Sequence, residues 1–243
     1  MTAQFHVAST DETLVSSFQQ EFGLPRFIAK TMAAHGIESI QEAEAFLSPD
    51  LARDWRNPYE IPDMDRAADR LEEAVRSGQK ILVFGDFDLD GISATTVLTR
   101  FALGANVTPL IPKRFEEGYG LTLQPLSGRK DTTPILLSRW TAASPEEEVE
   151  AIKADGIDVA ITDHHEPGST VPEGVPVADP KCDPKCESSI LAGVGVALKV
   201  VQVLGGRLGK PHLWRDYTDF ATLGTVADLM PLRGETAPWW RTA

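Results

Sequence analysis

The sequence predicts an α/β protein with a doubly wound, mainly parallel sheet and a helical N-terminal segment. Short, almost wholly apolar segments such as residues 80–84 alternate with amphipathic helical patterns, and the links between them are short. We expect a sheet of about five strands. Within the 243 residues, the predicted divisions are a helical segment at 1–60, one α/β domain at 61–235 and a short tail at 236–243.

The first 60 residues predict short helices followed by a loop. Apolar residues recur at helical spacing over 40–47, and Ser39 with Glu42 three positions later is typical of a capping box. Ser48 and Pro49 end that helix. Proline and tryptophan then interrupt residues 51–62, which predicts a loop.

The alternation of helix and strand begins at residue 64. The predicted elements, in chain order, are a helix at 64–76, a strand at 80–84, a helix at 93–103, a strand at 107–111, a helix at 146–154, strands at 158–162 and 175–178, and helices at 194–204 and 217–223. Residues 122–145 fit neither period. The central strand due there reads Leu136-Leu137-Ser138-Arg139-Trp140, and its arginine predicts poor packing over 138–143.

Composition excludes several classes of protein. A hydrophobic share of 42% rules out wholesale disorder, and the apolar runs are too short to span a membrane. Two cysteines make no disulfide framework and a poor zinc site, and the first residues lack a signal pattern, so we expect a cytoplasmic protein. The net charge of −13 argues against a broad basic surface for nucleic acid, but carboxylates around divalent cations also add negative charge.

Three alternating carboxylates directly follow the first predicted strand. Asp86, Asp88 and Asp90 lie where open α/β sheets bind ligands, beyond the carboxyl ends of the strands. Carboxylates this close repel one another and stay ionised most easily around cations, of which Mg²⁺ and Mn²⁺ suit oxygen ligands. The alternative is an acidic loop that caps the next helix.

A second candidate site follows the strand at 158–162. Asp163, His164 and His165 offer oxygen and imidazole nitrogen together, a combination that Mn²⁺, Fe²⁺ or Zn²⁺ favours over Mg²⁺. Asp228 lies in an otherwise apolar stretch, where a buried carboxylate needs a partner or a metal. Helix capping is an equally good interpretation of Asp228 by itself.

Four strings together resemble the DHH phosphoesterase superfamily and, within it, the RecJ family of exonucleases. They are Gly-Asp-Phe-Asp-Leu-Asp-Gly at 85–91, Thr-Asp-His-His-Glu-Pro-Gly at 162–168, Leu-Ala-Gly-Val-Gly-Val-Ala at 191–197 and Gly-Thr-Val-Ala-Asp-Leu-Met-Pro-Leu at 224–232. Pro-Asp-Met-Asp at 62–65 and Arg-Phe-Glu-Glu-Gly-Tyr-Gly at 114–120 favour RecJ over phosphoesterases of small substrates. The resemblance runs over about residues 20–235.

This resemblance implies a 5′-to-3′ exonuclease of single-stranded DNA, active in recombination and repair, with a pair of Mn²⁺ or Mg²⁺ ions. The implied metal ligands are Asp88, Asp90, His164 and Asp228, joined by Asp86. The implied catalytic residues are Asp163 and His165, as ligands or as partners that orient them. Arg114, and with it Lys113, would meet DNA phosphates, against the alternative of a solvated basic turn. Single-strand-binding protein or other repair proteins are the implied partners.

Two departures from the family pattern leave alternatives open. Relatives carry a metal-bridging aspartate where residues 138–143 read Ser-Arg-Trp-Thr-Ala-Ala, and they continue well beyond the fourth string. We expect an enzyme that is shortened and weak or inactive, and the alternative is a non-catalytic binding module for a replication or repair partner. The loss of one base at each of two places in the gene would shift the reading frame there, and would explain the unusual sequences at 138–143 and 236–243. Resequencing of the gene tests this hypothesis.

Overall fold

The computed structural model describes residues 9–101, 106–112, 135–137, 146–168 and 170–239. These residues belong to two compact units. One lies within residues 1–55 and 233–238, and the other within residues 56–232 and 239–243. Within the described ranges, no helix combines the length and the apolar character needed to cross a bilayer.

The first unit is helical, as the N-terminal sequence predicts. Its elements are α1 (Glu12–Phe22), α2 (Arg26–Ala34), α3 (Ile40–Leu47), α4 (Leu51–Asp54) and the short 3₁₀ helix η5 (Gly234–Thr236). Val15, Phe18, Ala29 and Met32 form its core. The capping box of α3 is only half formed: the Ser39 hydroxyl accepts from the Glu42 N–H at 3.1 Å, but the Glu42 carboxylate accepts from the Glu38 N–H.

The second unit contains the parallel sheet that the sequence predicts, in the order β2-β1-β3-β4-β5. All four pairings are parallel, and the described strands are β1 (Lys80–Phe84), β2 (Asn106–Leu110), β3 (Ile135–Leu137), β4 (Val159–Thr162) and β5 (Val177–Ala178). Strand β3 pairs with both β1 and β4, so it is the central strand, as expected of the segment around Leu136. The doubly wound α/β fold is therefore confirmed.

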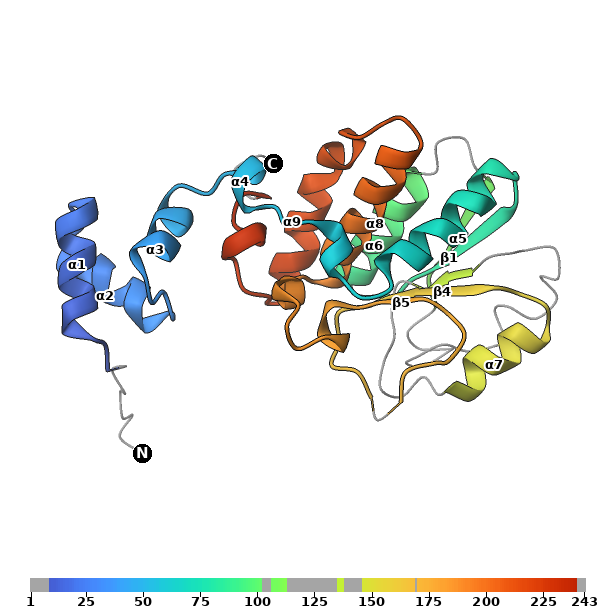
Figure 1. The fold of residues 1–243 in the computed structure, drawn as a ribbon, viewed down its shortest axis with the longest axis horizontal. Coiled ribbons are helices and arrows are strands. Elements are labelled where there is room, and N and C mark those ends of the chain that lie inside the picture. The colour runs from blue at the N-terminus through green and yellow to red at the C-terminus, as the bar shows by residue number, and fades with distance from the viewer. Residues whose placement is uncertain (1–8, 102–105, 113–134, 138–145, 169, 240–243) are drawn as a thin grey trace. The chain divides into compact units, whose positions relative to one another are not determined.

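Helices cover both faces of this sheet (Figure 1). The helical elements are η1 (Pro58–Glu60), α5 (Met64–Arg76), α6 (Leu89–Arg100), α7 (Glu146–Ala154), η2 (Pro180–Cys182), η3 (Glu187–Ile190), α8 (Gly193–Arg207), η4 (Leu213–Tyr217) and α9 (Thr218–Ala227). Helix α7 packs on one face, where Val149 and Ile152 meet Leu82 and Ile161. Helices α5, α6 and α8 lie on the other face. Because both faces are covered, β4 is buried along its whole length.

Several helix boundaries differ from the sequence prediction, and α9 runs to Ala227 rather than to 223. Helix α6 begins at Leu89 rather than near 93, because the Asp88 side chain caps it and accepts from the Gly91 N–H at 2.7 Å. The cap brings Asp90 into the first helical turn. Helix α8 continues through Gly205 and Gly206 to Arg207, although the paired glycines predict an end near 204.

The N-terminus of α5 protects the edge of the sheet at β5. Asp63 adopts a left-handed conformation with φ of 54°, and its Oδ2 accepts from the Val177 N–H at 3.1 Å. A backbone donor at an edge strand otherwise needs water or another strand. Asp63 also binds Arg66 through both carboxylate oxygens. The string at 62–65 therefore has a structural role in this unit.

Two predictions about irregular segments lie largely outside the described residues. Residues 138–143, predicted to be poorly packed, are not among them, and the tail at 236–243 is described only as far as Trp239. Trp239 is buried, and its indole lies so near α8 that a Cβ added at Gly195 would lie 3.1 Å from the ring.

Candidate metal centre

The candidate site lies at the carboxyl edge of the sheet, where β1 and β4 end. Asp86 follows β1 within two residues, and Asp163 follows β4 directly. Both strands are parallel, so their carboxyl ends lie at the same edge. Asp88, which caps α6, and His164 therefore lie at this one edge, as the metal-site prediction requires.

Asp90 is the most enclosed carboxylate of the first motif. It accepts hydrogen bonds from the Gly193 N–H at 2.8 Å and the Val194 N–H at 2.9 Å, the first backbone donors of α8. Burial raises the pKa of Asp90, and the charge of Asp228 adds to that rise, while His164 and the two N–H groups oppose it. The helix N-terminus therefore holds this carboxylate in place with favourable charge.

His164 lies between three carboxylates. Its Nε2 is 3.0 Å from Asp228 Oδ2, and its Nδ1 is 3.8 Å from Asp90 Oδ2 and 3.7 Å from Asp163 Oδ1. The last two distances are too long for hydrogen bonds. Burial lowers the pKa of His164, but the hydrogen bond to Asp228 and the charges of the three carboxylates together raise it above the ordinary value.

Asp163 organises both histidines. Its Oδ1 accepts from the His164 N–H at 2.7 Å and the His165 N–H at 3.3 Å, and it lies 2.7 Å from His165 Nδ1. Its Oδ2 is buried and has no hydrogen-bond partner among the described residues. His164 Nδ1 is likewise buried and has no hydrogen-bond partner among these residues. Unpartnered buried polar atoms are rare in folded proteins, and two potential metal-ligand atoms share this state here.

Three glycines let the backbone approach these side chains. A Cβ at Gly193 would lie 2.7 Å from Asp90 Oδ2 and 3.1 Å from His164 Nδ1, and one at Gly224 would lie 2.9 Å from Asp90 Oδ1. A Cβ at Gly91 would meet the backbone of Asp86 below 3 Å. Real Cβ atoms almost never make such contacts, so the motif glycines are required by the packing of α6, α8 and α9.

The donor atoms fit a divalent transition metal. Ligand atoms of Asp90, His164 and Asp228 lie within 4.8 Å of one another, and so do those of Asp163, His164 and His165. One imidazole nitrogen among carboxylate oxygens suits Mn²⁺ better than a purely oxygen site would. The two groups share His164, so the structure brings both sequence motifs and Asp228 into one centre.

Asp86 and Asp88, both predicted as metal ligands, are placed differently from Asp90, His164 and Asp228. Asp86 is buried, with Oδ1 accepting from the Phe87 N–H at 2.7 Å, and Asp88 is an exposed helix cap. Neither belongs to the two groups of three that could hold an ion. Arg114 and Lys113, predicted to meet DNA, lie outside the described residues.

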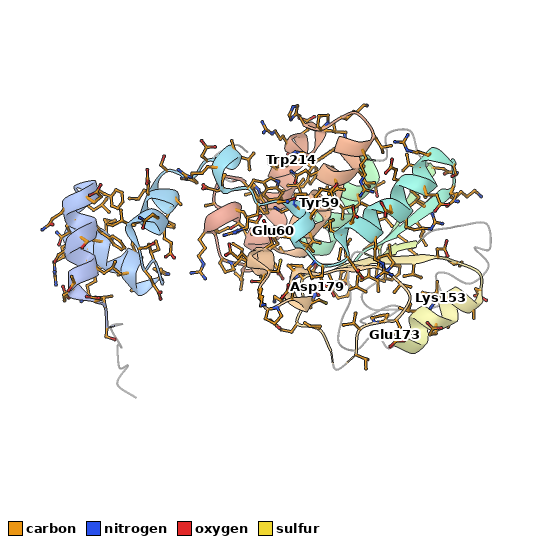
Figure 2. The ribbon with its side chains drawn as sticks, viewed as in Figure 1. Tyr59, Glu60, Lys153, Glu173, Asp179 and Trp214 are labelled. Carbon is orange, nitrogen blue, oxygen red and sulfur yellow. The ribbon has the colours of Figure 1, made fainter. Side chains whose placement is uncertain are left out.

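The sequence prediction missed Asp179. This carboxylate, labelled in Figure 2, follows β5 and is 1% exposed. It lies within electrostatic reach of Asp163 and His164. Burial, reinforced by the charge of Asp163, raises its pKa to about 6. Asp179 begins the repeated Asp-Pro-Lys-Cys string at 179–186 and follows an apolar strand as Asp163 does, and that signal could have identified it.

Comparisons with known proteins identify relatives of this chain. Residues 80–225 match the model of the DHH family, N-terminal domain. The chain is 35% identical over 236 residues to the single-stranded-DNA-specific exonuclease RecJ of Bacillus subtilis, covering 96% of this chain but 29% of the relative. The crystal structure of RecJ in complex with Mn²⁺ from Thermus thermophilus has a TM-score of 0.77 at 27% identity, covering 97% of this chain and 33% of the other.

A second structure of RecJ from Thermus thermophilus, in complex with Mg²⁺, has a TM-score of 0.65 at 25% identity and covers 97% of this chain and 30% of the other. The chain thus spans about a third of the length of the relatives it matches.

Proposed function

Because this chain belongs to the DHH family, we propose that it is the catalytic domain of a metal-dependent 5′-to-3′ exonuclease acting on single-stranded DNA. The observation that carries the proposal is the convergence of Asp90, His164 and Asp228 from three separate segments, with the buried His164 Nδ1 left without a hydrogen-bond partner among the described residues. The names of its relatives, RecJ exonucleases specific for single-stranded DNA, supply the substrate class. Their complexes with Mn²⁺ and Mg²⁺ support either ion as the cofactor.

Asp90, His164 and Asp228 would hold the ions, with Asp86 and Asp88 as further candidate ligands from the first motif. Two bound ions supply Lewis-acid stabilisation of the phosphate and a water of lowered pKa. Asp90 is held for this role by the N-terminus of α8. Its orientation therefore depends on protein hydrogen bonds and needs no ion to be set.

Asp163 and His165 form the pair best placed to move a proton. The carboxylate oxygen 2.7 Å from His165 Nδ1 can only accept, so Nδ1 carries the proton and Nε2 is the basic nitrogen. The His165 side chain is 35% exposed, while that of Asp163 is fully buried. A buried acid that orients a partly exposed imidazole is an arrangement suited to general acid–base chemistry.

We place the activity in DNA recombination and repair in the cytoplasm, with single-strand-binding protein or another repair protein as partner. The resemblance to the RecJ family supports this setting, and the lack of a disulfide between Cys182 and Cys186 is compatible with a reducing compartment. Because the net charge is −13, DNA phosphates would be held by local cations, for which Arg114 and Lys113 are the proposed residues.

A 5′-labelled single-stranded oligonucleotide tests the proposal. We expect weak Mn²⁺-dependent release of nucleotides, because residues 138–143 carry no carboxylate to offset repulsion between two ions. D228N should reduce the activity and the Mn²⁺ affinity at least tenfold, because Asp228 is a proposed ligand. D219N is the matched control, since Asp219 is an exposed carboxylate on α9, the helix that Asp228 directly follows.

Mn²⁺ binding that is unaffected by D228N would contradict the proposed centre. Oligonucleotide binding without any cleavage would favour the alternative, a non-catalytic binding module of the DHH fold. The missing carboxylate at 138–143 is the observation that favours this alternative.

A further inference from the structure

We propose that Asp179 is an additional carboxylate of the metal centre, which supplies negative charge to a cation held by Asp163 and His164. This inference rests on the proposed function, because it assumes that the carboxyl edge of the sheet binds a divalent ion. Neither sequence motif includes Asp179, and the family strings at 85–91, 162–168 and 224–232 do not reach it.

The parallel pairing of β4 and β5 places Asp179 beside Asp163. Thr162 is in register with Ala178, and the Asp163 N–H donates to the Ala178 carbonyl at 3.1 Å. Asp163 and Asp179 are therefore the first residues beyond the last paired positions of two adjacent strands. They are 0% and 1% exposed, so two buried carboxylates adjoin one another at this edge. Two such charges repel strongly unless a cation lies near them.

Helix capping does not account for the burial of Asp179. Its Oδ1 accepts from the Lys181 N–H at 2.8 Å, which caps the short helix η2. The next copy of Asp-Pro-Lys-Cys makes the same bond from a less buried position, where Asp183 Oδ1 accepts from the Lys185 N–H at 2.9 Å. The Lys181 ammonium lies 3.3 Å from Glu166, an exposed carboxylate. The turn thus forms equally well without a buried acid.

Independent evidence for a cation comes from the neighbours of Asp179. Asp163 Oδ2 and His164 Nδ1 have no hydrogen-bond partner among the described residues, and their side chains are 0% and 8% exposed. The charges of both residues act on Asp179. A divalent ion would satisfy these two ligand atoms and would also offset the repulsion between the two carboxylates.

The experiment compares D179N with D183N in the whole 243-residue chain. The amide retains the acceptor for the backbone cap and removes only the charge. Mn²⁺ affinity is measured by calorimetry, and the melting temperature is measured with and without Mn²⁺. We expect D179N to weaken Mn²⁺ binding at least tenfold and to shrink the Mn²⁺-induced rise in melting temperature, without lowering the melting temperature of the metal-free protein. D183N should change none of these quantities.

A cap without a role at the metal centre would leave the Mn²⁺ affinity of D179N and its Mn²⁺-induced rise in melting temperature unchanged, because asparagine still accepts from the Lys181 N–H, and that result overturns the inference. If D179N does not fold, D179S retains a capping acceptor and is subject to the same criterion. Loss of Mn²⁺ binding in H164A but not in D179N would overturn the inference and leave the proposed function intact. Unchanged binding in both variants would overturn both.

Discussion

Substitution of Gly193 by alanine tests how closely α8 is packed on the metal centre. The added Cβ would lie 2.7 Å from Asp90 Oδ2 and 3.1 Å from His164 Nδ1. Ordinary contacts of this kind are about 3.5 Å, so the carboxylate must move by roughly 0.8 Å. The same carboxylate accepts the two N–H groups that begin α8. The substitution therefore perturbs both a proposed ligand and the hydrogen bonds that orient it.

The expected cost of G193A follows from these distances. Overpacking of a filled site costs about 1–3 kcal/mol. Alanine by itself favours a helix over glycine by about 0.5–1 kcal/mol. Gly206 provides the matched control, because it also lies in α8 and a Cβ added there meets nothing within 4 Å. The helix gain is common to both variants, so the melting temperatures of G193A and G206A should differ by roughly 2–12 °C, since 1 kcal/mol corresponds to about 2–4 °C at this chain length.

The assay is thermal unfolding together with Mn²⁺ calorimetry of both variants. G193A should unfold at a lower temperature than the wild-type chain and bind Mn²⁺ at least tenfold more weakly, because a ligand displaced by about half an ångström leaves productive geometry. G206A should be as stable as wild type or more so, with unchanged affinity. If G193A behaved like G206A in both measurements, the close contact among Gly193, Asp90 and His164 would be refuted.

Two further predictions concern Asp179 and Asp63. The pKa of Asp179 rises from 3.8 to about 6 on folding, so its cost to stability is absent below pH 3.8 and complete above pH 6. The free energy of unfolding of metal-free D179N, measured in urea, should therefore rise relative to that of wild type between pH 4 and 7, by at most about 3 kcal/mol. A difference between the two proteins that did not change with pH would contradict this. D63A should lower the free energy of unfolding by about 1–3 kcal/mol, because the Val177 N–H loses its acceptor and alanine disfavours the positive φ. D63N should lower it by less than half as much, because asparagine retains the acceptor and tolerates the positive φ. Equal losses in the two Asp63 variants would show that neither the acceptor nor the backbone conformation matters.

Local pattern was sufficient for most elements of the second unit. The strand at Lys80–Phe84 and the helices at Met64–Arg76 and Glu146–Ala154 were predicted with the observed bounds. Their periods and end signals lie within the segments themselves, so no distant contact is needed to recognise them. The start of α6 was predicted four residues late, because the cap at Asp88 depends on the orientation of one side chain.

The sequence by itself determined the fold class, the parallel sheet and the chemistry of the motifs around Asp90 and His164. Only the tertiary structure decided which carboxylates meet. In the folded chain Asp228 Oδ2 lies 3.0 Å from His164 Nε2, Asp88 is an exposed helix cap, and Asp179 is buried beside Asp163. A sequence motif states which groups are available, but burial and the approach of a second helix determine which of them lose water, and desolvation is what makes a carboxylate hold a metal ion strongly.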